Sequence, residues 1–202
     1  GRIVPSFTRN WLAKRGATRL PTPTDRFDQA ALAVLAAALT AWIVAPFALA
    51  TSVLALAAGV LHALRLARWR GHATLAEPLV TVLHVGYAWL PVGMVLLGLE
   101  RVVPTLTLVS AEHALAAGAV GSMTLAVMTR ASLGHTGRAL TAGPVTVIIY
   151  VLVTLGALLR VTAYALPMDP LAALGAGGTL WAGAFLLYAL RYAPILARAR
   201  AG

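Results

Sequence analysis

The sequence predicts an all-α membrane protein, a polytopic bundle of six transmembrane helices. Hydrophobic residues make up 60% of the 202 residues and charged residues only 11%, which is unlike a soluble domain. The hydrophobic residues form runs of about 20, the length that a helix needs to cross ~30 Å of hydrocarbon. These runs are too long for membrane strands and do not alternate between apolar and polar residues. Because backbone groups find no water inside a bilayer, the runs are expected to be helices.

The six expected helices cover residues 28–46, 47–67, 78–99, 106–128, 142–163 and 171–191. The first begins after Thr24 and Asp25, whose side chains suit a helix N-terminus. No charge separates it from the second helix, so the turn at Pro46 is expected to be short.

Prolines mark the start of three later helices. Pro78, Pro144 and Pro170 each fall in the first helical turn, where a missing N–H costs nothing. The fourth helix has no such marker, but Ala114, Gly118 and Ser122 form a row of small residues in it, which favours close helix contact.

The distribution of positive charge predicts the orientation. The chain carries a formal charge of +10, and 14 of its 16 basic residues fall on one side of the predicted helices, leaving only Arg101 and Arg160 on the other. This is the positive-inside pattern, and such residues contact anionic lipid headgroups. We therefore expect cytoplasmic termini, a basic N-terminal segment (1–27), a basic tail (192–202) and no nucleic-acid partner.

Two histidines lie well inside predicted helices, where an imidazole is costly unless it has a ligand or a hydrogen-bond partner. His84 is followed by Tyr87 and by Pro91, which is expected to kink the helix. His113 has small residues one and two turns further along its face. Either histidine could bind a metal or haem, or simply bond to a neighbouring helix. They differ in depth by ~13 Å, judged from helical rise, so one haem cannot easily use both.

The remaining histidines are weaker candidates. His62 lies one turn before Arg65, and we expect it at the membrane interface, where an imidazole is cheap. His135 is expected in the loop between the fourth and fifth helices, and His72 in a solvated basic loop. With no cysteine in the chain, a metal would have to be bound by histidine, methionine or carboxylate.

Enzyme motifs are absent, including the P-loop, H-E-x-x-H, G-x-S-x-G and the dinucleotide fingerprint. Two alternatives to a metal-binding protein remain open. One is half of a transporter or permease with a proline-broken helix. The other is a structural or assembly subunit whose histidines only bond neighbouring helices.

Three stretches together resemble the NnrS family of bacterial membrane proteins. They are GRIVPSFTRNWL at 1–12, EPLVTVLHVGYAWLPVG at 77–93 and EHALAAGAVGSMTLAVMTRASLGHTGR at 112–138. The resemblance implies a multi-pass protein of the bacterial inner membrane that contains haem b and copper. It also implies a link to denitrification, nitric oxide metabolism and nitrosative-stress protection, with nitric oxide or dinitrosyl-iron species as possible ligands. Family members are about twice as long, so we expect this chain to be a C-terminal half that partners a missing N-terminal half.

The resemblance also suggests site residues. His84, His113 and His135 fall within the motifs, and His62 matches less securely. On this hypothesis these four histidines are candidate metal ligands, with His84 and His113 foremost. Arg130 and Arg138, at the cytoplasmic rim, are candidates for contacting the haem propionates or lipid phosphates.

Overall fold

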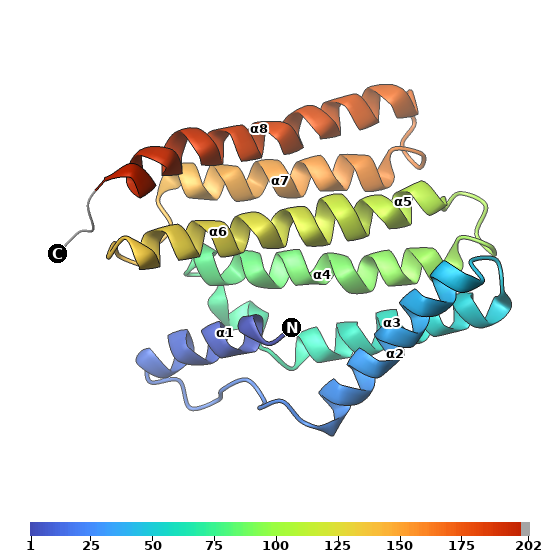
Figure 1. The fold of residues 1–202 in the computed structure, drawn as a ribbon, viewed down its shortest axis with the longest axis horizontal. Helices are drawn as coiled ribbons and strands as arrows, with labels where there is room; N and C mark the ends of the chain where they lie inside the picture. Colours follow the sequence, from blue (N-terminus) through green and yellow to red (C-terminus); the bar gives the residue numbers. More distant parts are fainter. Residues whose placement is uncertain (199–202) are drawn as a thin grey trace.

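The computed structural model describes residues 1–198 and contains only helices and loops over that range. Six helices are long and apolar enough to cross a membrane, which confirms the predicted fold class. Figure 1 shows them running side by side. Their bounds are α2 (Arg26–Val44), α3 (Leu49–Ala67), α4 (Pro78–Leu99), a continuous span of α5, η2 and α6 (Leu108–His135), α7 (Pro144–Thr162) and α8 (Pro170–Ala197).

Helices α2, α4 and α8 begin where a polar side chain caps their first N–H groups. At α2 the Asp28 N–H donates to Asp25 Oδ1 while the Asp25 N–H donates to Asp28 Oδ2, each at 3.2 Å, which is a capping box. Glu77 accepts from the Leu79 N–H at 3.2 Å at the start of α4. Asp169 caps α8 in the same manner.

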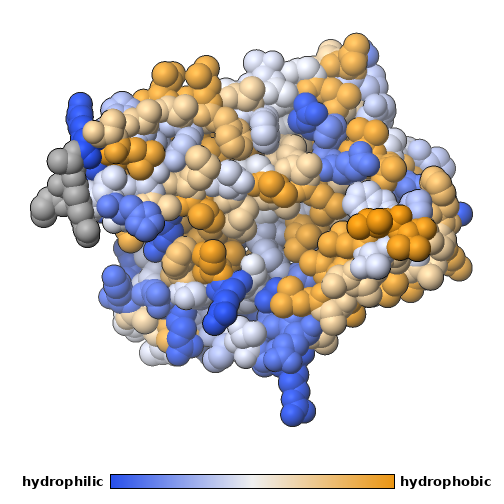
Figure 2. Space-filling view, viewed as in Figure 1, coloured by the Kyte–Doolittle hydropathy of each residue, from blue (hydrophilic) through white to orange (hydrophobic). Residues whose placement is uncertain are grey.

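The spanning helices form a row. Along it α8 packs on α7, α7 on η2, η2 and α6 on α4, α4 on α3, and α3 on α2 (Figure 1). The edge helix α2 packs mainly on α3 and leaves Ile43 and Val44 exposed. Figure 2 shows apolar side chains over the flanks of the row, while hydrophilic groups gather toward the end that holds α1 and the end of α8. This surface is that of a multi-pass membrane protein.

A π-helix interrupts the fourth span. The segment η2 (Ala114–Gly121) lies between α5 (Leu108–His113) and α6 (Ser122–His135), without a break in the helix. Its glycines admit large rings, since a Cβ at Gly118 would stand 2.5 Å from the Trp89 ring and one at Gly121 would stand 2.6 Å from Trp181 Nε1. π-Helices are rare and frequently occur at functional sites.

The two terminal segments contain more helix than the sequence indicates. Within the basic segment 1–27, helix α1 (Ile3–Lys14) buries Val4, Thr8 and Leu12 and packs on α4 and the short 3₁₀ helix η1 (Gly71–Thr74). The sequence does not predict this helix, because its few apolar residues are interspersed with charged ones. At the other end α8 continues to Ala197, into the segment 192–202 expected to be a tail; residues 199–202 lie outside the described chain.

Helices α7 and α8 approach most closely at Gly156. A Cβ there would stand 2.8 Å from both Gly177 O and Trp181 N, backbone atoms that cannot swing aside. We expect Gly156→Ala to lower the free energy of unfolding by about 1–3 kcal/mol, the usual cost of overpacking. Unfolding in mixed micelles with increasing SDS measures this. Gly175→Ala is the control, because nothing lies within 4 Å of its added Cβ, and equal losses in the two variants would contradict the prediction.

Candidate functional site

A cavity of about 730 Å³ lies between the π-helix and helices α7 and α8. Its wall is apolar for most of its length, with polar groups gathered at the His113 end. The residues that define it are His113, Ala116, Ala117, Arg160, Trp181 and Phe185. The small residues of η2 make a flat wall, because they project no long side chains into the space.

Trp181 lines the cavity where α8 meets η2. Its indole Nε1–H donates to the backbone oxygen of Ala117 at 3.1 Å, and its ring packs on Phe185 with 4.4 Å between ring centroids. The acceptor of this hydrogen bond lies within the π-helix. The small residues of η2 and the aromatic rings of α8 therefore line the cavity in contact with each other.

Arg160 supplies a positive charge at the His113 end of the cavity. Its guanidinium passes over Gly178, where a Cβ would stand 3.0 Å from Nη1, and Nη1 donates to Leu174 O at 3.4 Å. Among the described residues, the ion pairs involve only Arg65 and Arg68 as cations, so Arg160 has no carboxylate partner there. Glu112 lines the same cavity and forms no ion pair within residues 1–198.

His84 lies in a different place, buried beneath α1. The Thr8 hydroxyl donates to Val4 O at 2.8 Å, so the 2.8 Å contact between His84 Nε2 and Thr8 Oγ1 has the imidazole as donor. The other ring nitrogen, Nδ1, is buried with no partner in the described part of the chain and faces Gly71. His84 and His113 thus belong to separate sites, as their depths indicate.

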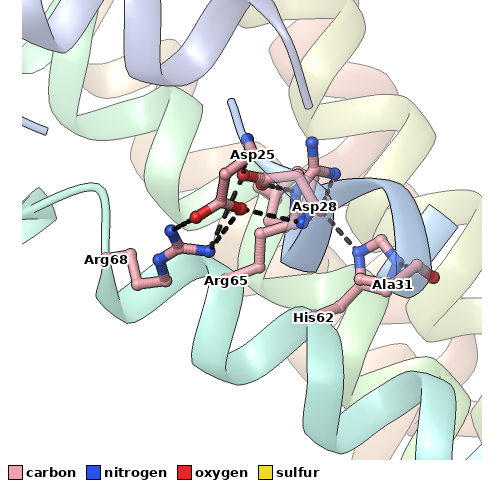
Figure 3. A network of polar contacts seen from close by, with 7 residues as sticks. Asp25, Asp28, Ala31, His62, Arg65 and Arg68 are labelled. Atoms are coloured by element: carbon pink, nitrogen blue, oxygen red, sulfur yellow. Dashed lines mark hydrogen bonds and ion pairs between the residues drawn. The ribbon is translucent and has the colours of Figure 1, made fainter. Parts of the chain in front are cut away.

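His62 lies near the end of α3, but neighbouring helices bury it fully, at 1% exposure. Its Nε2 lies 3.2 Å from Ala31 O, and its Nδ1 lies 2.5 Å from the Tyr87 hydroxyl. The burial comes from α2, whose first turns cross α3 at this point (Figure 3). Spacing along α3 alone could not show that a neighbouring helix covers this residue.

The remaining candidates lie away from the cavity. His135 is the exposed last residue of α6. The Arg130 guanidinium lies 4.1 Å from the centroid of the Phe7 ring, and Arg138 Nη1 donates to Thr136 O and Ile195 O at 3.5 Å. Within the described chain, no three His, Asp or Glu side chains converge as a metal would require.

An ion-pair network joins the start of α2 to the end of α3 (Figure 3). Arg65 Nε donates to Asp28 Oδ1, with both side chains buried, and Arg68 donates to Asp25 at the rim. Arg68 also lies 3.7 Å from Asp28 Oδ2. The network anchors α2, which otherwise has few neighbours.

The exposed ion pair between Arg68 and Asp25 is expected to persist in mild acid. The hydrogen bond from Arg68 lowers the pKa of Asp25 from 3.8 to about 2. Because the pKa is lower in the folded state, the contribution of this pair to stability is complete above pH 3.8 and is lost as the pH falls through about 2. NMR of the Asp25 carboxyl carbon should show this midpoint, and Arg68→Gln should return it toward 3.8. A wild-type midpoint near 3.8 would contradict the assignment.

Comparison with known proteins gives one match. A family model described as "NnrS protein" matches residues 1–200. No curated protein and no solved structure matches the chain.

Proposed function

The chain belongs to the NnrS family, and from this premise we propose that it is a membrane protein that binds haem b in the cavity beside His113. The family membership supports a role in nitric oxide metabolism and nitrosative-stress protection. Most positive charges lie at the same end of the spanning helices. This supports a bacterial inner-membrane location in which that end faces the cytoplasm. On this proposal both ends of the described chain lie in the cytoplasm.

The observation that carries the proposal is the pairing of His113 with Arg160 at one end of an apolar cavity. Haem requires an imidazole for its iron, cations for its propionates and a flat apolar space for its ring. His113, Arg160 and the slot that η2, Trp181 and Phe185 line together provide these in turn. Arg160 therefore takes the role that the sequence suggested for Arg130 and Arg138, which lie elsewhere.

The protein's contribution is to hold, orient and shield the group. His113 would ligate the iron, Arg160 would fix the propionate edge, and Trp181 and Phe185 would exclude water from the ring faces. Bound haem iron supplies a coordination position for a small uncharged ligand such as nitric oxide. Such a ligand can enter from the bilayer, because the cavity wall is mostly apolar.

Copper does not fit the described residues equally well. A copper centre needs several imidazole, thioether or carboxylate donors around one point. No three His, Asp or Glu side chains converge in residues 1–198, and one ring nitrogen of His84 and both of His62 are already hydrogen-bonded. We therefore assign copper no site within this part of the chain and derive no step through it.

An absorption spectrum of the full chain, made in haem-replete cells, tests the proposal. We expect a Soret band in the wild type, its loss or marked shift in His113→Ala, and weaker haem retention in Arg160→Gln. His135→Ala is the matched control, because His135 is exposed and outside the cavity. An unchanged spectrum in His113→Ala would overturn the assignment. Loss of the band only in His84→Ala would move the haem to the site beneath α1.

A further inference from the structure

Tyr87 and His62 form a buried acid–base pair that haem binding does not use. Their side chains are 6% and 1% exposed, and the Tyr87 oxygen lies 2.5 Å from His62 Nδ1. The pair joins α3 to α4, close to the ion pairs of Figure 3. Its contacts determine where each proton resides.

The carbonyl of Ala31 can only accept a hydrogen bond, so His62 Nε2, at 3.2 Å from it, must carry the ring proton. In the neutral ring, Nδ1 is then a free lone pair and accepts from the Tyr87 hydroxyl. Arg65 Nη1 donates to the same phenol oxygen at 3.0 Å. Tyr87 therefore has a proton acceptor on one side and a cation on the other.

The other tyrosines of the chain lack such an acceptor. The hydroxyls of Tyr150, Tyr188 and Tyr192 pair with hydroxyls of threonine or serine at 2.5–2.9 Å, and these neutral groups are far weaker proton acceptors than imidazole. Tyr164 is 44% exposed and has only solvent to receive its proton. Among the five tyrosines, Tyr87 alone is bonded to a base.

We propose that Tyr87 is a redox-active tyrosine and that His62 is its proton acceptor. When a metal-centred, high-potential one-electron oxidant removes an electron from the Tyr87 ring, the phenolic O–H bond breaks and an N–H bond forms at His62 Nδ1. The products are a neutral tyrosyl radical, an imidazolium and the oxidant reduced by one electron. The reverse transfer restores both side chains, so the pair stores and returns one electron and moves one proton over a single hydrogen bond.

The surroundings favour this short proton transfer. The buried Asp28 carboxylate pairs with Arg65 beside Tyr87, and it offsets part of the positive charge that the imidazolium adds. The Trp69 ring packs against Tyr87 with 4.6 Å between centroids and helps to keep water away. A dry, hydrogen-bonded pair confines the proton to His62.

The position of Tyr87 connects it to the haem proposed above, and this part of the inference rests on that proposal. A second cavity, of about 560 Å³, is lined by Tyr87 and shares Val120 and Thr124 with the His113 cavity. The helix that carries η2 and α6 therefore borders both the cavity at Tyr87 and the cavity proposed for haem. Haem iron at a high oxidation level is the oxidant class that this placement favours.

The test uses an external oxidant, so that its failure is distinct from a failure of haem binding. The full chain in lipid nanodiscs, in a Tyr164→Phe background, is oxidised by photogenerated tris(bipyridine)ruthenium(III). The radical is followed by transient absorption and by EPR. We expect a tyrosyl signal that Tyr87→Phe removes and that the matched buried control Tyr150→Phe leaves unchanged.

His62→Gln tests the proton acceptor, because an amide accepts the phenolic hydrogen bond but cannot take the proton. We expect oxidation of Tyr87 to slow by about a hundredfold, the lower end of what a positioned base contributes. A Tyr87→Phe protein that gives the same signal as its Tyr150→Phe control would overturn the proposal. So would an unchanged oxidation rate in His62→Gln. If His62→Gln fails to insert, the comparison of Tyr87→Phe with Tyr150→Phe decides alone.

Discussion

Asp28→Ala should lower the free energy of unfolding by about 3–5 kcal/mol, the cost of leaving a buried charge without its partner. The Arg65 guanidinium is 4% exposed and pairs with Asp28, so after the substitution it must remain uncompensated in a dry site or drag water inward. Because the pair also joins α2 to α3, the loss should include the docking of α2. SDS-driven unfolding in mixed micelles measures the loss of stability, and hydrogen exchange of the α2 amides measures the loss of docking.

Two further variants distinguish the effect of losing the ion pair from a nonspecific loss of stability. Asp25→Asn removes the exposed carboxylate of the same network, and its effect should be much smaller, since exposed ion pairs contribute little. The double variant Asp28→Leu/Arg65→Met should recover most of the stability, because replacing both members of a buried pair by apolar groups is often neutral. A double variant as unstable as Asp28→Ala would show that the charges are not the cause.

Gly121→Leu should abolish haem binding while leaving His113 in place. A Cβ at this position would stand 2.6 Å from Trp181 Nε1 and 3.0 Å from the adjoining ring carbons, so a larger side chain must force the indole out of its position. The hydrogen bond from Trp181 to Ala117 breaks, and the ring is displaced into the slot proposed for haem. Haem occupancy per protein, from a pyridine haemochrome assay, is the measurement.

Gly183→Leu is the control for this substitution, because nothing lies within 4 Å of its added Cβ. It should retain haem at the wild-type level. Haem retained in Gly121→Leu, in protein that elutes as wild type, would mean that the group does not occupy the slot beside η2 and Trp181. Loss in both variants would point to a general effect of leucine on the bundle.

The sequence is sufficient to predict the fold class, because bilayer physics permits few alternatives. Runs of about 20 apolar residues must be helices, and Pro78, Pro144 and Pro170 stand in the first turns of α4, α7 and α8 as their backbone chemistry predicts. Helix α1 is harder to find in the sequence, since three buried residues in a basic stretch make a weak signal. The packing of helices into a row depends on shape complementarity, which no single segment encodes.

The candidate site is only partly readable in the sequence. His113 and its small neighbours are visible, but the π-helix that follows has no known signature in a run such as ALAAGAVG. Arg160 was missed, although it is one of two basic residues on the side poor in positive charge and falls inside an apolar run. The surroundings of His62 depend on Ala31 of α2, which lies 31 residues away along the chain, and contacts of that kind appear only in three dimensions.

The two edge helices of the row, α8 and α2, are held by different numbers of neighbouring helices. Helix α8 is held along α7 and also touches α6, whereas α2 relies mainly on α3 and on the charges at its first turn. Partial opening should therefore begin at α2, at a lower free energy than global unfolding. Amide hydrogens of α2 should exchange with deuterium before those of α4 and α7, and the same opening would briefly bring water to His62, whose ring contacts Ala31 of α2.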